Sequence, residues 1–377
     1  MIHVLANQIF KPLYQRKMIR PTRFIELLEP YSITAQDVWS DIAPTNLLKI
    51  DWNEAPVELS FYQEELKRIA SDHGMIAWYP DYLALNLTDA LSSFVNVSSN
   101  NILTFPGSDV GLETLCRTYL NPEDVVVALC PTYENFFVYV TQMGAELRKF
   151  QLDRPFEIDE HQIISDLKSI GNVKLFYLAT PNNPCGYTVP IKFIRMLAEQ
   201  FPQTLFVVDE AYIEFSDSDS AAPLVTQFSN IVVFRTFSKA FGMAGLRLGY
   251  MCASLDIINN VNKIRNGKNV SMIAQRLGLC ALENFNLVDE WIQKIIISRR
   301  KFQKWCKAHN IDFYPSQGNF VLFRVSRPNE LCSELKAQGI YVRNRDSIVS
   351  GCVRVTIGNE NQLARLISAL EKMRNLL

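Results

Sequence analysis

Short apolar segments alternate with helical patterns between about residues 100 and 252 of this chain. The segments with the length and apolar character of buried strands are Val125–Leu129, Lys174–Ala179, Leu205–Val208, Ile231–Phe234 and Leu248–Cys252. Helical patterns lie between several of them, at 109–120, 133–143 and 190–200. Apolar strands that alternate with helices predict a mostly parallel sheet covered by helices on both faces.

The pattern changes after about residue 255. Helical sequence continues to about 308, and the later elements are a strand at Phe320–Val325, a helix at 328–338, strands at Ile340–Val342 and Val353–Ile357, and a last helix from 360. These elements predict a smaller α+β domain. Residues 1–55 are irregular and rich in proline and aromatic residues, and we expect an arm that joins this smaller domain. The predicted division is an arm at 1–55, a large domain at 56–265 and a small C-terminal domain at 266–377.

The composition is that of an ordinary folded protein, with 48% hydrophobic and 20% charged residues among 377. The 38 basic and 39 acidic residues leave a net charge of −1, and no run of basic residues marks a surface for nucleic acid or for a membrane. We therefore expect small-molecule partners and a second copy of the chain, with no nucleic acid and no membrane among the partners.

The chain also lacks the signals of export and of a metal site. No apolar run approaches the ~20 residues of a membrane span, and the N-terminal segment lacks the small-residue cleavage pattern of a signal peptide. None of the eight cysteines forms a CxxC pair and no histidine cluster accompanies them, which argues against a zinc site. Free cysteines fit a reducing cytosol, so a cytoplasmic protein without a metal is expected.

Two charged residues follow predicted strands. Asp209 comes directly after Leu205–Val208, and Lys239 follows Ile231–Phe234 closely. Each has an ordinary explanation alone, since such an aspartate often caps a helix and such a lysine is usually a solvated surface charge. Ligands of a parallel sheet, however, bind beyond the carboxyl ends of its strands. The combination of these residues is therefore more informative than either one.

The residues around Lys239 supply what a pyridoxal phosphate site requires. A lysine held in a cleft can form an imine, and a carboxylate at the pyridine nitrogen keeps the ring protonated as an electron sink. A phosphate group needs hydroxyls, backbone N–H groups and a cation. Asp209, Ser238, Lys239 and Arg247 meet these needs within about 40 residues, and 106–109 precedes a predicted helix whose N-terminus suits a phosphate.

Three segments resemble the histidinol-phosphate aminotransferase family, which belongs to the fold-type I pyridoxal-phosphate enzymes. They are Ala179–Gly186 (ATPNNPCG), Val208–Phe215 (VDEAYIEF) and Arg235–Tyr250 (RTFSKAFGMAGLRLGY). The resemblance extends from residues 30–31 to 351–358. It implies an α/β fold in which a large cofactor-binding domain carries a mostly parallel central sheet, next to a smaller α+β domain.

The resemblance implies a role for each residue near the cofactor. Lys239 forms the imine with the cofactor and moves the proton at the substrate, and Asp209 pairs with the pyridinium nitrogen. Asn183 and Tyr212 bind the phenolic oxygen of the cofactor, while Tyr133 either stacks on the ring or is simply a half-buried aromatic residue of a helix. The residues expected at the cofactor's phosphate are Ser108, Asp109, Thr236, Ser238 and Arg247, joined by Tyr79 of a neighbouring subunit in a homodimer.

The resemblance also implies the substrate contacts. Arg354 binds the substrate's α-carboxylate, and Arg343 and Tyr31 contact the substrate's phosphate. Asn53 lies in a segment near the substrate. Lys268 stands in a loop where the family usually has an aromatic residue, and it either receives an anionic group of the substrate or is solvated.

The function implied is that of a pyridoxal-phosphate-dependent aminotransferase of amino-acid biosynthesis. L-Glutamate is the expected amino donor, and a small phosphorylated keto compound such as imidazole-acetol phosphate is the expected acceptor. A related decarboxylase of a phosphorylated amino acid shares these motifs and is the alternative. A transcription regulator with an aminotransferase-like domain is disfavoured, because residues 1–55 are too short and lack a basic recognition helix.

Overall fold

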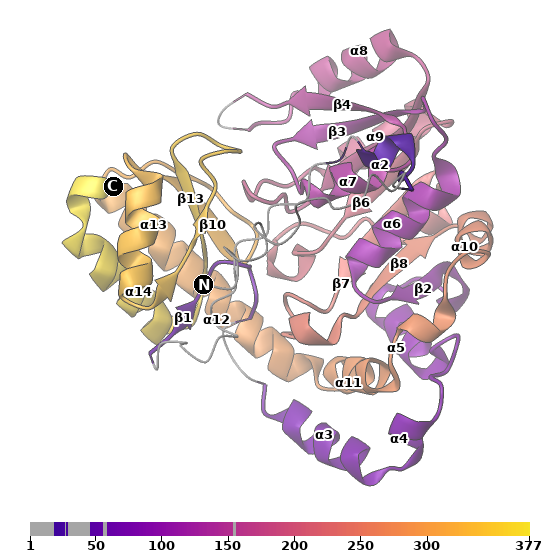
Figure 1. Cartoon of the computed structure of the whole chain (residues 1–377), viewed down its shortest axis with the longest axis horizontal. Coiled ribbons are helices and arrows are strands. Elements are labelled where there is room, and N and C mark those ends of the chain that lie inside the picture. Colours follow the sequence, from indigo (N-terminus) through magenta and orange to yellow (C-terminus); the bar gives the residue numbers. More distant parts are fainter. Residues whose placement is uncertain (1–18, 27, 29–45, 56–58, 154–155) are drawn as a thin grey trace, which may run out of the picture.

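A computed structural model describes residues 19–26, 28, 46–55, 59–153 and 156–377. It consists of a large unit around a seven-stranded sheet and a smaller unit around a four-stranded sheet (Figure 1). The long helix α12 (Phe285–Ala308) runs from the large unit toward the small sheet. Within the described part of the chain, no helix has both the length and the apolar character that a membrane crossing requires.

The large sheet has the strand order β2-β8-β7-β6-β5-β3-β4. Its strands are β2 (Ile102–Phe105), β3 (Val125–Cys130), β4 (Glu146–Gln151), β5 (Val173–Ala179), β6 (Leu205–Asp209), β7 (Ile231–Thr236) and β8 (Gly249–Ala253). The strands from β3 to β7 pair in parallel, whereas β8 is antiparallel to both of its neighbours. The predicted mostly parallel sheet is thus confirmed, although the sequence pattern did not reveal β2 and β4.

Apolar side chains project from both faces of this sheet, because successive residues of a strand point to opposite sides. On β3, Val126 and Ala128 belong to one buried cluster, and Val127 and Leu129 belong to the other. The first face is covered by α6 (Ser108–Tyr119), α7 (Asn135–Thr141) and α10 (Leu255–Asn262). The second is covered by α5 (Leu85–Val95), α8 (Glu160–Ile170), α9 (Ile191–Gln200), α11 (Met272–Glu283) and α12, and α3 (Phe61–Ser71) and α4 (Gly74–Ala77) pack against α11.

The small sheet is antiparallel, in the order β12-β13-β10-β9. Its strands are β9 (Phe313–Tyr314), β10 (Phe320–Arg324), β12 (Arg343–Asn344) and β13 (Cys352–Thr356), and α13 (Pro328–Ala337) and α14 (Glu360–Lys372) lie beside it. The strand predicted at Ile340–Val342 is shorter, and as β11 (Ile340–Tyr341) it pairs in parallel with β1 (Leu48–Lys49). The domain boundaries at 55/56 and 265/266 stay a prediction.

Candidate active site

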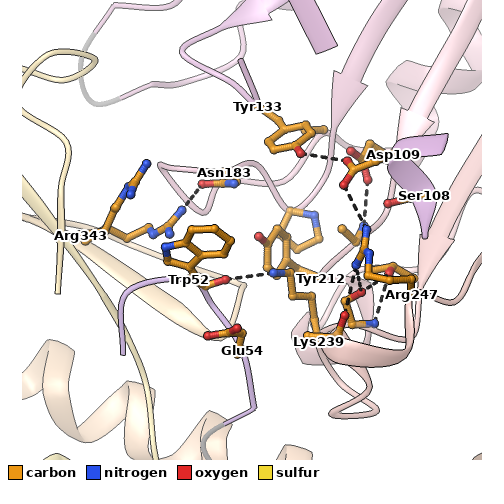
Figure 2. A pocket seen from close by; sticks show the side chains of 18 of the residues that line it. Trp52, Glu54, Ser108, Asp109, Tyr133, Asn183, Tyr212, Lys239, Arg247 and Arg343 are labelled. Carbon is orange, nitrogen blue, oxygen red and sulfur yellow. Dashed lines mark hydrogen bonds and ion pairs between the residues drawn. The ribbon is translucent and has the colours of Figure 1, made fainter. Parts of the chain in front are cut away.

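A cavity of about 520 Å³ lies at the carboxyl ends of the central strands and is closed on its other side by the small sheet (Figure 2). The large sheet contributes Asp209 at the end of β6 and Thr236 at the end of β7, and Lys239 follows β7. The small sheet contributes Arg343 of β12 and Arg354 of β13. Residues more than 100 positions apart in the sequence therefore meet in one space, which is within the usual size range of a small-molecule site.

Lys239 points into this cavity from the loop after β7 (Figure 2). Its Nζ donates a hydrogen bond of 3.0 Å to the backbone oxygen of Trp52 and lies 5.8 Å from the centre of the Tyr212 ring. The hydroxyl of Tyr212 accepts a 3.0 Å hydrogen bond from Nδ2 of the buried Asn53. Tyr212 is therefore fixed beside the amine, and Asn53 is the residue that fixes it.

Asp209 is a buried carboxylate at the end of β6, next to Lys239. Burial raises the pKa of Asp209 from 3.8 to about 6, and hydrogen bonds from Tyr177 and from the Ala211 N–H act in the opposite direction. The neighbouring charge of Lys239 lowers the pKa less than these hydrogen bonds do. A carboxylate in such a place is stabilised by a cationic group that comes within hydrogen-bonding distance.

The opposite end of the cavity is rich in hydrogen-bond donors. Arg247 donates 3.3 Å hydrogen bonds to Oγ of Ser238 and to Oδ2 of Asp109, and Oγ of Ser238 lies 3.0 Å from Oγ1 of Thr236. Helix α6 begins here at Ser108, so its free N–H groups face the same space. Hydroxyls, helix N–H groups and a guanidinium together suit a phosphate group.

Gly107 makes this donor-rich end possible. It precedes α6 with φ +84°, a conformation that residues with a side chain rarely adopt. A Cβ atom at this position would lie 2.5 Å from Nη2 of Arg247. The absence of a side chain therefore lets the guanidinium approach the first turn of the helix.

Arginines of the small unit line the remaining part of the cavity: Arg343, Arg345 and Arg354. Arg354 is buried, and it donates hydrogen bonds to Oδ1 of Asn183 and, over 2.8 Å, to the backbone oxygen of Asp51. Its Nε has no hydrogen-bond partner among the described residues. Burial first, and then the charge of Arg345, lower the pKa of Arg354. No carboxylate of the described residues forms an ion pair with Arg354, so this end is prepared for an anion.

The structure brings most of the predicted site residues together in this cavity. They are Ser108, Asp109, Tyr133, Asn183, Asp209, Tyr212, Thr236, Ser238, Lys239, Arg247, Arg343 and Arg354. Asn53 is placed behind Tyr212 rather than in the cavity lining. Tyr79 and Lys268 lie together on the surface, with Nζ of Lys268 5.0 Å from the centre of the Tyr79 ring. Tyr31 lies outside the described residues.

Among the lining residues with aromatic or charged side chains, three were not predicted from the sequence: Trp52, Glu54 and Arg345. Trp52 and Glu54 flank Asn53, which lies in a segment that resembles the family's sequence near the substrate. Their position beside Asn53 could therefore have indicated that they line the site. Arg345 is two residues from Arg343. Residues two apart in an extended segment share a face, and this simple rule could have found Arg345, whose N–H donates to the Cys352 oxygen just after the end of β12.

The donors and acceptors of the cavity fit pyridoxal 5′-phosphate. Asp209 supplies a buried carboxylate for a pyridinium nitrogen, and Lys239 supplies a primary amine for the aldehyde. Arg247, Ser238 and the first turn of α6 match a phosphate group. The arginines of the small unit then remain for a second, separate anion.

Comparison with known proteins agrees with this fit. The chain is 32% identical over 353 residues to a dihydroxyacetone phosphate transaminase of Campylobacter jejuni, covering 92% of this chain and 95% of the relative. It is 33% identical over 364 residues to a histidinol-phosphate aminotransferase of Christiangramia forsetii, covering 95% and 98%. The crystal structure of a histidinol-phosphate aminotransferase of Sinorhizobium meliloti in complex with pyridoxal 5′-phosphate has the same fold, with a TM-score of 0.84, 24% identity, and coverage of 94% of this chain and 97% of that one.

The match to a protein family covers most of the chain. Residues 46–370 match the family described as aminotransferase class I and II. The resemblance on which the sequence analysis relied and the predicted fold-type I architecture are both confirmed. This chain belongs to the aminotransferase class I and II family and is a pyridoxal-phosphate-dependent transaminase.

Proposed function

We propose that this enzyme transfers an amino group between L-glutamate and a small phosphorylated ketone. The observation that carries the proposal is the cluster of Arg343, Arg345 and Arg354, which faces the same cavity as Lys239 and Asp209. Such a cluster matches an amino donor that has an α-carboxylate at one end and a second anionic group at the other. The two curated relatives act, by their names, on phosphorylated compounds, and this supports a phosphate as the second anion.

The residues near Lys239 would hold the cofactor. Asp209 would receive the pyridinium nitrogen, Asn183 and Tyr212 the phenolic oxygen, and Tyr133 one face of the ring. The residues assigned to the phosphate are Ser108, Asp109, Thr236, Ser238 and Arg247. When bound, the cofactor supplies an aldehyde that takes up the amino group and a ring that accepts electrons.

The residues of the chain bind, orient and move protons around that chemistry. Arg354 would bind the α-carboxylate of the donor glutamate with two parallel N–H donors, which would fix the Cα of glutamate near Nζ of Lys239. Nζ of Lys239 would then take the proton from the donor's Cα and deliver it to the cofactor, and in the other half of the cycle it would move a proton from the cofactor to the acceptor carbon that receives the amino group. Arg343 and Arg345 receive the phosphate, or the side-chain carboxylate of glutamate in the other half of the cycle. Asn53 keeps the Tyr212 hydroxyl in place through the whole cycle.

We further propose a homodimer that works in the cytoplasm. Five large apolar side chains between residues 76 and 85 are exposed, those of Ile76, Trp78, Tyr79, Leu83 and Leu85, and such a concentration of exposed apolar residues is typical of a protein interface. In the dimer, Tyr79 would reach the cofactor's phosphate in the neighbouring subunit, and Lys268 beside it would arrive at the same site. The free cysteines support the reducing compartment.

Spectroscopy of the purified holoenzyme tests the function. Addition of L-glutamate should remove the absorbance band of the lysine-bound cofactor and release 2-oxoglutarate. Dihydroxyacetone phosphate or imidazole-acetol phosphate should then restore the band. The decarboxylase alternative predicts a different result, in which glutamate leaves the band unchanged and phosphothreonine or phosphoserine releases carbon dioxide.

A further inference from the structure

The side chain of Trp52 lies between the amine and the arginines of the cavity. In Figure 2 its indole is seen between Tyr212 on one side and Arg343 on the other, with the indole nitrogen toward Arg343. The backbone oxygen of the same residue accepts the hydrogen bond from Nζ of Lys239. Trp52 therefore borders the path that any substrate must span between Lys239 and the arginine cluster.

Hydrogen bonds hold the backbone on both sides of Trp52, so the position from which its side chain extends is fixed. The oxygen of Asp51 accepts a 2.8 Å hydrogen bond from Arg354. Asn53, which has a φ of 56°, donates its N–H to Oγ1 of Thr356 over 2.9 Å, and its oxygen accepts from Nδ2 of Asn319 over 3.0 Å. Three successive residues are thus tied to the walls of the cavity, and the two hydrogen bonds of Asn53 are independent of Arg354 and Lys239, so they hold the segment when a ligand binds these two residues.

The ring itself is held from the outer side. Nζ of Lys49 lies 5.3 Å from the centre of the indole and forms ion pairs with Asp51 and Glu54. The indole N–H is buried and has no hydrogen-bond partner among the described residues. A buried donor in a cavity lined by cations is suited to an oxygen atom of an anionic ligand.

We propose that Trp52 determines the substrate's size, limiting this enzyme to short phosphorylated ketones of about three carbons. The proposal rests on the proposed transamination of a phosphorylated ketone. The cavity of about 520 Å³ has to hold the cofactor and the substrate together. The indole lines the cavity between Tyr212 and Arg343, where the substrate has to lie, so a compound whose chain carries an imidazole ring competes with it for space. A compound of the size of dihydroxyacetone phosphate does not.

Two amino compounds of different size test whether Trp52 limits the length of the substrate. Serinol phosphate is the amine that corresponds to dihydroxyacetone phosphate, and L-histidinol phosphate carries the additional imidazole. The dependence of the rate of loss of the cofactor band on concentration gives kcat/KM for each compound. We expect the wild-type holoenzyme to prefer serinol phosphate, and Trp52→Ala to shift the ratio of the two kcat/KM values toward histidinol phosphate by at least about tenfold.

Two further variants separate bulk from other effects. Trp52→Phe keeps an aromatic ring in the cavity and should keep the wild-type ratio of the two kcat/KM values. Trp52→Leu should shift this ratio in the same direction as Trp52→Ala, and it replaces the alanine variant in the test if that variant does not fold. Trp305→Ala removes a half-buried tryptophan of α12 that does not line the cavity, and it should leave the ratio unchanged.

The outcomes distinguish this inference from the function on which it rests. If wild-type enzyme shows no spectral change with glutamate or with either phosphate compound, the proposed function is wrong. If it reacts but prefers histidinol phosphate, or if Trp52→Ala and Trp52→Leu retain the wild-type ratio, only the role of Trp52 is overturned. A Trp52→Phe variant that loses selectivity as fully as Trp52→Ala would also overturn the size argument.

Discussion

The hydroxyl of Tyr177 donates a 2.7 Å hydrogen bond to Oδ2 of Asp209, and both side chains are buried. The two residues lie on the neighbouring strands β5 and β6. The ring of Tyr177 stacks on Phe136 with 4.1 Å between the ring centres. The ring of Tyr177 thus packs in the core, while its hydroxyl donates its hydrogen bond to the carboxylate of Asp209.

Tyr177→Phe should therefore weaken cofactor binding while the fold is retained. The substitution keeps the stacked ring and removes one donor from Asp209, which raises the pKa of that carboxyl further and makes it a poorer partner for a pyridinium nitrogen. A hydrogen bond to a charged group contributes about 1.5–3 kcal/mol, so the Kd of pyridoxal phosphate should rise by at least about tenfold. Fluorescence titration of the apoenzyme measures this constant.

Tyr250→Phe provides a matched control. Tyr250 is also fully buried in the large sheet, but its hydroxyl has no hydrogen-bond partner among the described residues. Its removal should leave the cofactor's Kd unchanged. Equal effects of the two substitutions would show that the bond to Asp209 has no special role.

Asp209→Asn should change how the stability of the apoenzyme depends on pH. The pKa of Asp209 is raised to about 6 in the folded protein and is near 3.8 without burial. Between these values the folded state keeps a proton that the unfolded state releases, so the wild type loses stability as pH rises from about 4 to 6. Asparagine does not titrate.

The stability difference between the variant and the wild type should therefore grow in favour of the variant over this range. A pKa change from 3.8 to about 6 corresponds to about 3 kcal/mol. Denaturant unfolding of both apoproteins at pH 4 and pH 7 measures it. Glu210, whose pKa burial raises to about 7, titrates in both proteins and does not disturb the comparison. A difference that is independent of pH would contradict the assignment.

Arg345→Leu should make the apoenzyme more stable and the enzyme less able to bind phosphorylated substrates. The charge of Arg345 lowers the pKa of Arg354, which means that the two cations repel each other in the folded protein. Removing one should raise the free energy of unfolding by about 1 kcal/mol, while the KM of the phosphorylated substrate should rise by about tenfold. Arg300→Leu, at an exposed arginine outside the cavity, should change neither value. A loss of stability in Arg345→Leu would point to a structural role instead.

A mixture of Lys239→Ala and Tyr79→Ala chains should regain activity that neither variant has alone. If Tyr79 acts in the neighbouring subunit, a mixed dimer has one intact site, formed by Lys239 of one chain and Tyr79 of the other. Random exchange makes half of the dimers mixed, so about a quarter of all sites should be active. Co-expression with two purification tags followed by assay of the mixed dimer measures this, and an inactive mixed dimer would place Tyr79 in its own subunit's site or in none.

The sequence predicted the chemical centre of the site well and its substrate end poorly. Asp209 and Lys239 follow apolar strands within distinctive motifs, so their positions could be inferred without knowing any distance. Trp52 could not be found in this way, because it lies in an irregular segment and meets Lys239 only through the folding of distant parts of the chain. Contacts between residues nearly 190 positions apart depend on tertiary structure, which local patterns do not describe.

The fold shows the same limit. Buried strands such as β6 were recognised because their residues before the terminal Asp209 are all apolar, as is usual in parallel sheets. The edge strand β4 has the sequence ELRKFQ and exposes several of its charged side chains, so it lacks that signal. Its pairing with β3 is set by the tertiary structure rather than by its own composition.

The two carbonyl groups of Asp51 and Trp52 occupy the hydrogen-bond donors of Arg354 and Lys239. A carboxylate that binds Arg354 and a carbonyl compound that binds Lys239 have to displace them. Ligand binding and the opening of these two hydrogen bonds are therefore linked equilibria, and each one shifts the other by the same free energy. Hydrogen exchange at residues 51–53 should consequently report occupancy of the site, even though these backbone groups take no part in the reaction.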